Sequence, residues 1–220
     1  MSIRPGWFYH PEEDDKVKSP GQLADLYYRS VGHNATFLLN FPVDRDGLIH
    51  PVDSANAVAF HKIIERELGH NIVAGMAPKV SSTRGKQFAA KAMTDNSWDT
   101  YWATPDGVTT ANIEFRLKKP QPMNRIMLQE YIPLGQRVRK FSVEYLAADG
   151  SWKAVEQPEQ TTTIGYKRIV RFVTVKTKGI RVRILDARGP LCINNVGVYY
   201  GGKDAQLSWS KAAEDITSLP

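Results

Sequence analysis

Apolar residues recur at helical spacing near the start of the chain. The positions that share one helical face are Leu23, Leu26, Tyr27 and Val31. Ser19 followed by Pro20 is typical of an N-cap and a first helical position, and Gly32 is typical of a helix end. The pattern therefore predicts a helix over residues 20–31.

The next apolar segment, ATFLLNF at residues 35–41, is a continuous run of strand length. Such a run is typical of a strand that is covered on both faces. After it, the spacing predicts a second helix with Asp53 or Ser54 as its N-cap and Gly69 as its end. The apolar stripe of this helix is Ala57, Phe60, Ile63, Ile64 and Leu68.

Residues 1–70 thus predict the order strand, helix, strand, helix, with SIRPGWF at residues 2–8 as the first, short strand. This order is typical of parallel strands joined by helical crossovers. Two strands are too few to cover residues 35–41 on both faces. We therefore expect residues 1–70 to be held by the following domain, by self-association with a second copy of the chain, or only loosely.

From residue 71 the helical spacing gives way to alternation of apolar and polar residues. Six strand candidates follow one another: residues 111–117, 124–131, 139–146, 167–175, 179–185 and 196–200. Asp149-Gly150 is typical of a hairpin turn between Leu146 and Trp152. Residues 71–200 therefore predict an all-β sandwich or jelly roll. For residues 201–220, which are largely polar, we expect a loose helix or disorder.

Charge separates the two units. The net charge of +6 is made of 7 Lys/Arg against 10 Asp/Glu in residues 1–70, 20 against 10 in residues 71–200, and 2 against 3 in residues 201–220. The basic sandwich has two interpretations. Its cations can be the solvated faces of alternating strands, or they can favour anionic partners such as sulfated or sialylated glycans. No nucleic-acid motif or basic helix is present, so nucleic acid is not an expected partner.

Several classes of protein are disfavoured by what the sequence lacks. No apolar run approaches the roughly 18 residues of a membrane span, and the N-terminus has no signal-peptide layout. The single cysteine, Cys192, excludes an internal disulfide. No Ser-His-Asp order, phosphate-binding glycine loop or Cys/His zinc pattern is found.

Two segments of the first unit carry a family resemblance. SIRPGWFYHPEEDDKVKS (residues 2–19) and LYYRSVGHNATFLLNFPVDRDGLIHPVD (residues 26–53) resemble the C-terminal end of the barrel in family 29 glycoside hydrolases, the α-L-fucosidases. The resemblance implies hydrolysis of terminal L-fucose from glycans in the complete enzyme. It also implies that residues 1–70 are a partial (β/α) barrel, and that Trp7 and His10 lie near the sugar pocket. The alternatives are that Trp7 packs a loop against the rim and that His10 makes a structural hydrogen bond.

Retaining glycosidases need two carboxyl groups about 5 Å apart. Nothing in the chain matches the family's nucleophile motif, so no catalytic residue is carried over. The carboxylates of residues 12–15 are typical of a solvated loop. We expect the chain by itself not to be catalytic.

The second unit resembles a coagulation factor V/VIII type C (discoidin-like) domain, a fold shared by many family 32 carbohydrate-binding modules. The matching segments are KAMTDNSWDTYWAT (residues 91–104), LQEYIPLGQRVRKFSVEY (residues 128–145) and TTTIGYKRIVRF (residues 161–172). The expected fold class is therefore mainly β: a discoidin-like jelly-roll sandwich after a partial barrel.

The resemblance also implies a structural calcium site at Asp95, Asp99 and Thr100, although no cofactor is required. The family's glutamate in the last strand looks replaced by Asn195. The alternative is that Asp95 and Asp99 make side-chain-to-backbone turns.

Sugar-binding sites combine an aromatic platform with polar groups. The loop residues that fit this description are Trp98, Tyr131, Tyr166 and Arg137, whereas Trp102 and Trp152 are expected in the core. The expected ligands are fucosylated or acidic glycans. The alternatives are a stand-alone glycan-binding module or a module that binds acidic lipid or protein surfaces. The relatives are exported, periplasmic or extracellular, or lysosomal, but this chain carries no address that indicates its compartment.

Overall fold

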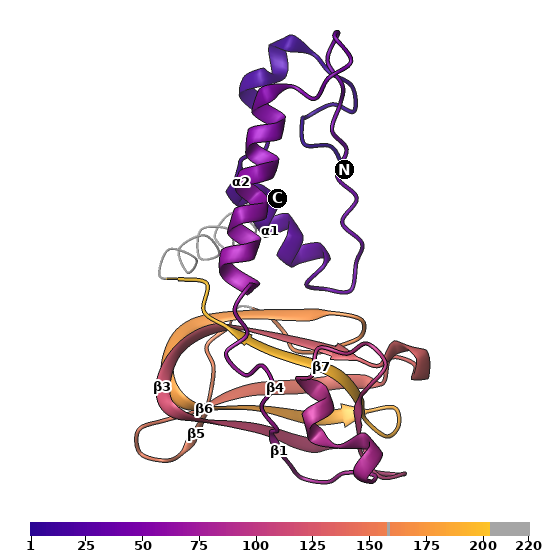
Figure 1. The fold of residues 1–220 in the computed structure, drawn as a ribbon, viewed down its shortest axis with the longest axis vertical. Coiled ribbons are helices and arrows are strands. Elements are labelled where there is room, and N and C mark those ends of the chain that lie inside the picture. Colours follow the sequence, from indigo (N-terminus) through magenta and orange to yellow (C-terminus); the bar gives the residue numbers. More distant parts are fainter. Residues whose placement is uncertain (158, 203–220) are drawn as a thin grey trace.

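The computed structural model describes residues 1–157 and 159–202, so nearly all of the predicted tail, from residue 203 onward, lies outside the described residues. Two parts follow one another along the long axis: a pair of helices, and a curved β-sheet below them (Figure 1). Its elements are η1 (Pro11–Lys16), α1 (Pro20–Ser30), α2 (Pro51–Leu68), β1 (Lys79–Val80), η2 (Lys86–Phe88), η3 (Ala90–Met93), β2 (Trp102–Ala103), β3 (Ala111–Glu130), η4 (Ile132–Leu134), β4 (Val138–Leu146), β5 (Trp152–Ala154), β6 (Arg168–Ala187) and β7 (Cys192–Tyr199).

The first predicted helix is confirmed as α1. Ser19 and Gln22 form a capping box, in which the Ser19 hydroxyl accepts from the Gln22 amide and the Gln22 side chain accepts from the Ser19 amide. This reciprocal pair satisfies two backbone donors that a helix start leaves open. The buried residues of α1 are Leu23, Ala24 and Tyr28. Of the predicted apolar face only Leu23 is among them, whereas Leu26, Tyr27 and Val31 are half-buried, so the buried face is turned from the predicted one.

The second helix is present, but its predicted cap is wrong. His50 is the N-cap of α2, with Nδ1 accepting from the Val52 amide, and Pro51 is the first helical residue. Asp53 does not cap the helix because its carboxylate is buried against Arg4. Since proline at the first turn already suits a helix start, the carboxylate two residues later is available for a tertiary contact.

The predicted strands at residues 2–8 and 35–41 are also wrong. Of these segments only Ser2 and Asn40 form a bridge, which is parallel as expected. Leu38, at the centre of the apolar run, is 72% exposed. A strand needs hydrogen-bonding neighbours on its edges, and the described residues offer only this single bridge.

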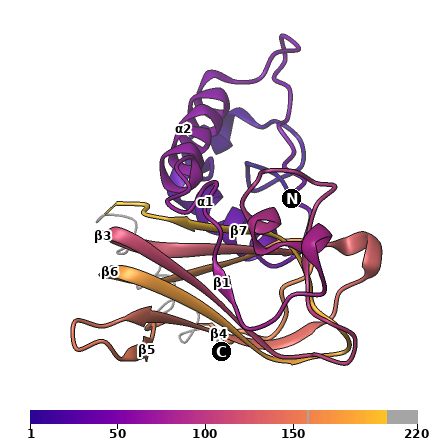
Figure 2. The same ribbon diagram turned by 60° about the horizontal axis from the view of Figure 1, so that its bottom comes forward.

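The sheet of the second part has the order β2-β7-β3-β6-β4-β5, with β1 paired to β3, and all of its pairings are antiparallel. Strands β3 and β6 are long and curved, so the sheet bends over itself and encloses its apolar face (Figure 2). Each of them replaces two of the predicted shorter strands. Between the two predicted strands 111–117 and 124–131, β3 continues through an irregularity, since the β3–β6 register shifts between Arg116 and Gln121. The mainly β, discoidin-like sandwich is thereby confirmed.

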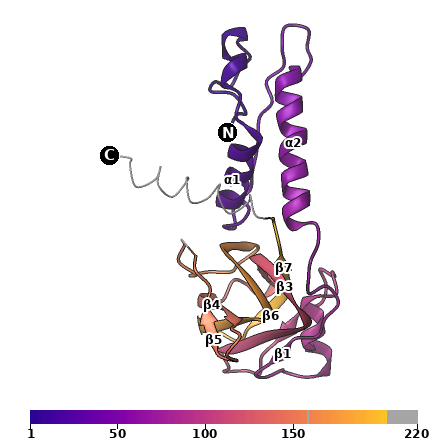
Figure 3. The same ribbon diagram turned by 90° about the vertical axis from the view of Figure 1, so that its left-hand side faces the viewer.

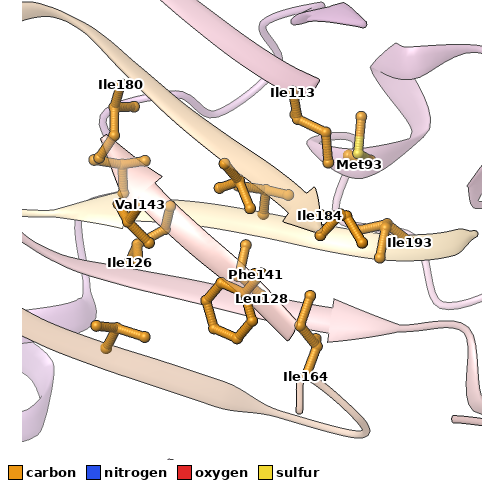
Figure 4. Close-up of a cluster of buried hydrophobic side chains, with 14 of the residues drawn as sticks. Met93, Ile113, Ile126, Leu128, Phe141, Val143, Ile164, Ile180, Ile184 and Ile193 are labelled. Atoms are coloured by element: carbon orange, nitrogen blue, oxygen red, sulfur yellow. The ribbon is translucent and has the colours of Figure 1, made fainter. Parts of the chain in front are cut away.

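The core lies between the two layers of this sheet and draws on β3, β4, β6 and β7 (Figure 4). Phe172, Phe141 and Trp102 are among its largest fully buried side chains. Trp102 is therefore core, as predicted. Trp152 is not: it is half-buried and lies between the guanidinium groups of Arg116 and Arg181, 4.7 and 4.4 Å from its ring centre.

Helices α1 and α2 stand on one side of the sandwich (Figure 3). A buried charge network fixes them there. Arg125 of β3 donates to the Glu67 carboxylate of α2 at 2.9 Å and to the Tyr28 hydroxyl of α1 at 3.0 Å. Tyr28 in turn donates to Glu67 at 2.6 Å. Burial raises the pKa of Tyr28, so this hydroxyl keeps its proton. Three elements thus share one closed network.

A second group of contacts joins the end of α1 to β6. The Ile169 amide donates to the Gly32 carbonyl, and the Lys167 amide donates to the Asn34 side chain at 2.8 Å. Arg171 donates to Asp25 at 3.1 Å. Of the arrangements expected for residues 1–70, the structure shows the one in which the sandwich holds them.

Candidate functional site: a glycosidase rim and an aromatic sandwich end

The first group of candidate residues is organised by Arg4, which is fully buried. Its guanidinium forms a two-point ion pair with Asp53, at 2.8 and 2.9 Å, and also donates to Asp14 at 2.8 Å and to the His10 carbonyl at 3.4 Å. A planar guanidinium suits such a fork of carboxylate contacts. Arg4 thereby joins the start of α2, the η1 segment and the Trp7–His10 loop.

Asn40 supports the same loop from the other side. Its side-chain amide donates to the Trp7 carbonyl at 2.9 Å and to the Ser2 hydroxyl at 3.2 Å. The indole of Trp7 itself is 54% exposed, and the His10 imidazole is also exposed, 3.9 Å from Glu12. The backbone of this loop is therefore held, while both predicted site side chains face outward.

The acidic run at residues 12–15 behaves as an ordinary 3₁₀ segment. η1 has no buried residue, and Asp14 is engaged by Arg4. His50 also approaches Asp14, with Nε2 3.5 Å from the carboxylate. This arrangement stabilises the loop and gives no isolated pair of carboxyl groups for acid–base catalysis.

The second group of candidates lies at one end of the sandwich, where Trp98 and Tyr166 come together. Their rings are nearly parallel, 13° apart in orientation, with centres 6.2 Å apart. Both are exposed, by 62% and 54%. Two stacked, exposed rings from different loops present aromatic surface of the kind that suits the apolar face of a sugar ring.

Buried polar groups hold the loops that carry these rings. The Glu130 carboxylate accepts from the amides of Gly165, Arg137 and Val138 at 2.7 to 2.9 Å. Gln129 donates to the Tyr166 carbonyl at 3.1 Å. Since these contacts come from the end of β3, this strand fixes the position of the Tyr166 loop, whereas the Trp98 loop is contacted by Asn194 of β7.

The remaining predicted residues have different roles. Tyr131 stacks on Tyr101 with ring centres 4.2 Å apart, and Phe88 lies 5.1 Å beyond Tyr101. Tyr101 was not among the predicted site residues, although it lies between Thr100 and Trp102 of the family signature. Arg137 donates to the carbonyls of Leu134 and Pro190, so its guanidinium holds loops together instead of facing solvent alone.

Lys167 adds a polar group beside Tyr166. Burial lowers the pKa of its ammonium group. Its backbone is tied to Asn34 through both its amide and its carbonyl. The aromatic end therefore lies next to the junction with residues 1–70.

The calcium prediction can be compared with the donors present. Asp95 accepts from the Ser97 amide at 2.9 Å and from the Thr100 hydroxyl at 2.7 Å, which is the predicted alternative of a side-chain-to-backbone turn. The side chain that reaches this loop from β7 is the amide of Asn194, whereas Asn195 pairs with Gln129 of β3. In the described residues no group of three or more His, Cys, Asp or Glu side chains is placed to hold a metal ion. This donor set, with one engaged carboxylate and a donating amide, does not fit the hard oxygen cage that calcium prefers.

The two candidate sites lie at opposite ends of one segment. Asn34 contacts the sandwich beside Tyr166, and Asn40 holds the Trp7 loop. Six residues of chain span at most about 20 Å, and Figure 1 shows this segment rising away from the sandwich. Residues 34–40 thus join the two candidate sites, with the aromatic end on the sandwich and the Trp7–His10 rim in residues 1–70.

A curved, antiparallel, two-layered sheet with aromatic loops at one end defines a discoidin-like β-sandwich. Residues 78–196 match the F5/8 type C domain family, which is more than half of the chain. The chain belongs to the F5/8 type C domain family.

Similarity to known proteins extends beyond the sandwich. A crystal structure described as a "putative alpha-L-fucosidase" from Bacteroides thetaiotaomicron is 42% identical, with a TM-score of 0.86 over 90% of this chain and 43% of its own. A Ruminococcus gnavus GH29 fucosidase in complex with fucose is 32% identical, with a TM-score of 0.83 over 92% of this chain and 41% of its own. Alpha-L-fucosidase 1 of Arabidopsis thaliana is 32% identical over 204 residues, which are 90% of this chain and 39% of the relative.

These matches include residues 1–70 as well as the sandwich, because 90% of the chain is more than the sandwich alone. The chain spans about two fifths of the length of the curated relatives it matches. Within the residues that the structure describes, no helix has the length and apolar character needed to cross a membrane.

Proposed function

We propose that the chain is the C-terminal portion of an α-L-fucosidase, in which residues 1–70 complete the rim of the fucose pocket and the sandwich binds glycan. The observation that supports this most is the similarity to GH29 fucosidases across both parts of the chain. The Arg4 network agrees with it, because a fully buried guanidinium is used to fix the backbone of an otherwise exposed Trp7–His10 loop.

By itself, the chain of 220 residues is proposed to be inactive. A retaining glycosidase needs a carboxylate nucleophile and a carboxyl acid close together. Of the carboxylates beside the rim, Asp14 and Asp53 are both engaged by Arg4. Incubation with an aryl α-L-fucoside should release phenol no faster than buffer alone does. Phenol release by many turnovers per chain that survives repeated purification would overturn this part of the proposal.

The Trp98–Tyr166 pair is the proposed glycan-binding platform of the sandwich. On an array of fucosylated and other glycans, Trp98→Ala should reduce binding at least tenfold. Val58→Ala is the control, because it removes an exposed apolar side chain on α2, away from both candidate sites. Equal loss in both variants, or binding unchanged in Trp98→Ala, would count against the platform.

A second candidate ligand is an acidic glycan, supported by a group of cations at the β3–β6 bulge. The bulge places residues 117–120 opposite Lys178, and the exposed lysines there are Lys118, Lys119, Lys176 and Lys178. In the described part of the chain none of these four makes an ion pair, whereas Arg116 beside them pairs with Glu114 at 3.6 Å. Unpaired cations on adjoining strands favour a polyanion.

Dextran sulfate tests this second candidate. Binding should weaken steeply with salt, because its driving force is charge pairing between exposed groups. The double variant Lys118→Glu with Lys119→Glu should lose it, while Lys16→Glu with Lys62→Glu should not. Binding to phosphatidylserine vesicles without binding to dextran sulfate would exclude an acidic glycan as the ligand of these lysines and indicate an acidic lipid.

Association through residues 1–70 is a further proposal, supported by exposed apolar side chains such as Phe8 and Leu38. Sedimentation of the chain should show a dimer that Leu38→Asp dissociates. A monomer at all concentrations would exclude it.

A further inference from the structure

Three backbone carbonyl oxygens of the Trp98 loop converge on one side chain of β7. The Asn194 amide nitrogen lies 2.7 Å from the Thr100 carbonyl oxygen, 3.0 Å from that of Ser97 and 3.5 Å from that of Trp98. Asn194 is buried, with 5% of its surface exposed. The side chain below the loop is thus an amide whose N–H groups point into a cluster of oxygens.

The backbone explains why Asn194 takes this position and Asn195 does not. The β3–β7 register pairs Gln129 with Asn195 and then Glu130 with Ile193, so Asn194 is the extra residue of a bulge. A bulge residue is released from the strand ladder and its side chain is re-aimed. Here it is turned toward the carbonyls of residues 97–100.

Carbonyl oxygens that converge on a buried side chain need a positively charged or hydrogen-bond-donating partner there. A calcium ion, which the resemblance to discoidin-like domains implies for this loop, would be one such partner. In this chain the Asn194 amide donates hydrogen bonds to the carbonyls. Each carboxylate oxygen of Asp95 already accepts a hydrogen bond, one from the Ser97 amide and one from the Thr100 hydroxyl. The hydrogen-bonding needs of the loop are met by the protein itself.

We propose that the Asn194 amide takes the place of a calcium ion below the Trp98 loop, so that the loop holds its conformation without metal. Asn194 is then a positioning residue for Trp98, since it contacts the loop backbone and not the indole. The inference does not depend on what Trp98 binds, because its test reads the loop and not the ligand.

The isosteric change Asn194→Asp tests this directly. It replaces the donating nitrogen by a carboxylate oxygen of nearly the same size and position. Without calcium, oxygen would then face oxygen, and the thermal midpoint should fall by about 5 °C for this 220-residue chain. Calcium chloride in millimolar amounts should restore at least half of that loss in Asn194→Asp and none of it in Asn194→Ala.

Three further measurements complete the experiment. The midpoint of the unchanged chain should be the same within about 1 °C in calcium and in EGTA, and calorimetric titration with calcium alone should give no binding heat. Asn195→Asp is the matched control and should show neither the loss nor the rescue. The emission spectrum of Trp98, isolated by subtracting the Trp98→Phe variant, should shift in Asn194→Asp and return with calcium.

Binding of calcium by the unchanged chain, or a rise of its midpoint by more than about 3 °C with calcium, would overturn the proposal. So would an Asn194→Asp chain in EGTA that is as stable as the unchanged one. If the Asn194 variants do not fold, the titration of the unchanged chain decides the question alone.

Discussion

The two parts of this molecule stabilise themselves in different ways. The sandwich encloses an apolar cluster that is continuous across four strands. In residues 1–70, by contrast, α2 has only two buried residues, Asp53 and Glu67, and both are carboxylates. Each is paired to an arginine from elsewhere, Asp53 with Arg4 and Glu67 with Arg125.

Exposed apolar residues show the same contrast. Of the fourteen large apolar side chains exposed in the described residues, nine lie in the first 58. A surface rich in such side chains is normally covered by a partner. The sandwich is thus held by burial of apolar surface, whereas residues 1–70 are held by two buried ion pairs and by attachment to the sandwich.

The largest expected effect comes from separating the parts. A chain of residues 71–202 should unfold in a single cooperative transition, because its core is complete. Residues 1–70 alone should show little helix and no cooperative transition, because isolated helices of this length are marginal. Far-ultraviolet circular dichroism against temperature measures both transitions. Cooperative melting of residues 1–70 would show that this part has a stable fold of its own.

The next effect contrasts a core residue with an exposed one. Phe172→Ala removes a fully buried ring and should cost about 3–5 kcal/mol of unfolding free energy. At concentrations where the chain is monomeric, Leu38→Ala should change it by less than about 0.5 kcal/mol, since Leu38 is largely exposed in the single chain. Urea denaturation measures both values. A comparable cost for Leu38→Ala would show that residues 35–41 are covered in solution.

A third prediction concerns the joint between the parts. Arg125→Met leaves the Glu67 carboxylate buried without its partner, and loss of one member of a buried pair costs about 3 kcal/mol. The loss should fall on the attachment of residues 1–70. Hydrogen exchange should therefore speed up in α1 and α2 while the amides of β4 keep their protection, and uniform acceleration would mean that Arg125 stabilises the sandwich instead.

The smallest effect is a pH dependence of the same joint. Burial opposes ionisation of Glu159, but the hydrogen bond with His33 and the charges of Arg168 and Arg171 outweigh it, so the pKa of Glu159 is lowered. A lowered pKa stabilises the folded state above the pKa of the unfolded carboxyl, about 4.3, and this contribution is lost as the pH falls through the folded value.

Exchange protection near His33 should consequently be constant from neutral pH down to about 5 and decrease below about 4. Glu159→Gln should remove this acid-dependent step. A step that persists in Glu159→Gln would assign it to another carboxyl group.

Much of the molecule could be predicted from sequence where the signal is local. The Ser19 N-cap with Pro20 after it, the Asp149-Gly150 hairpin and the alternation of strand residues act within a few residues. Each was therefore readable without the fold. Trp98 and Tyr166 are also predicted from the sequence to be aromatic residues of loops. No local pattern shows that these two residues, 68 positions apart, stack on each other.

Other features of the molecule depend on neighbouring segments and on strand register, and the sequence pattern alone does not predict them. ATFLLNF has the composition of a buried strand, yet a strand requires partners, and here the segment has one bridge. Asn194 and Asn195 are indistinguishable in sequence, and a single bulge decides which of them faces the Trp98 loop. The fold class of the sandwich and the family resemblance can be predicted from the sequence, because they follow from local pattern and motif. The tertiary structure decided which polar groups are buried and paired, because hydrogen-bond partners from distant segments are set only when the strands align.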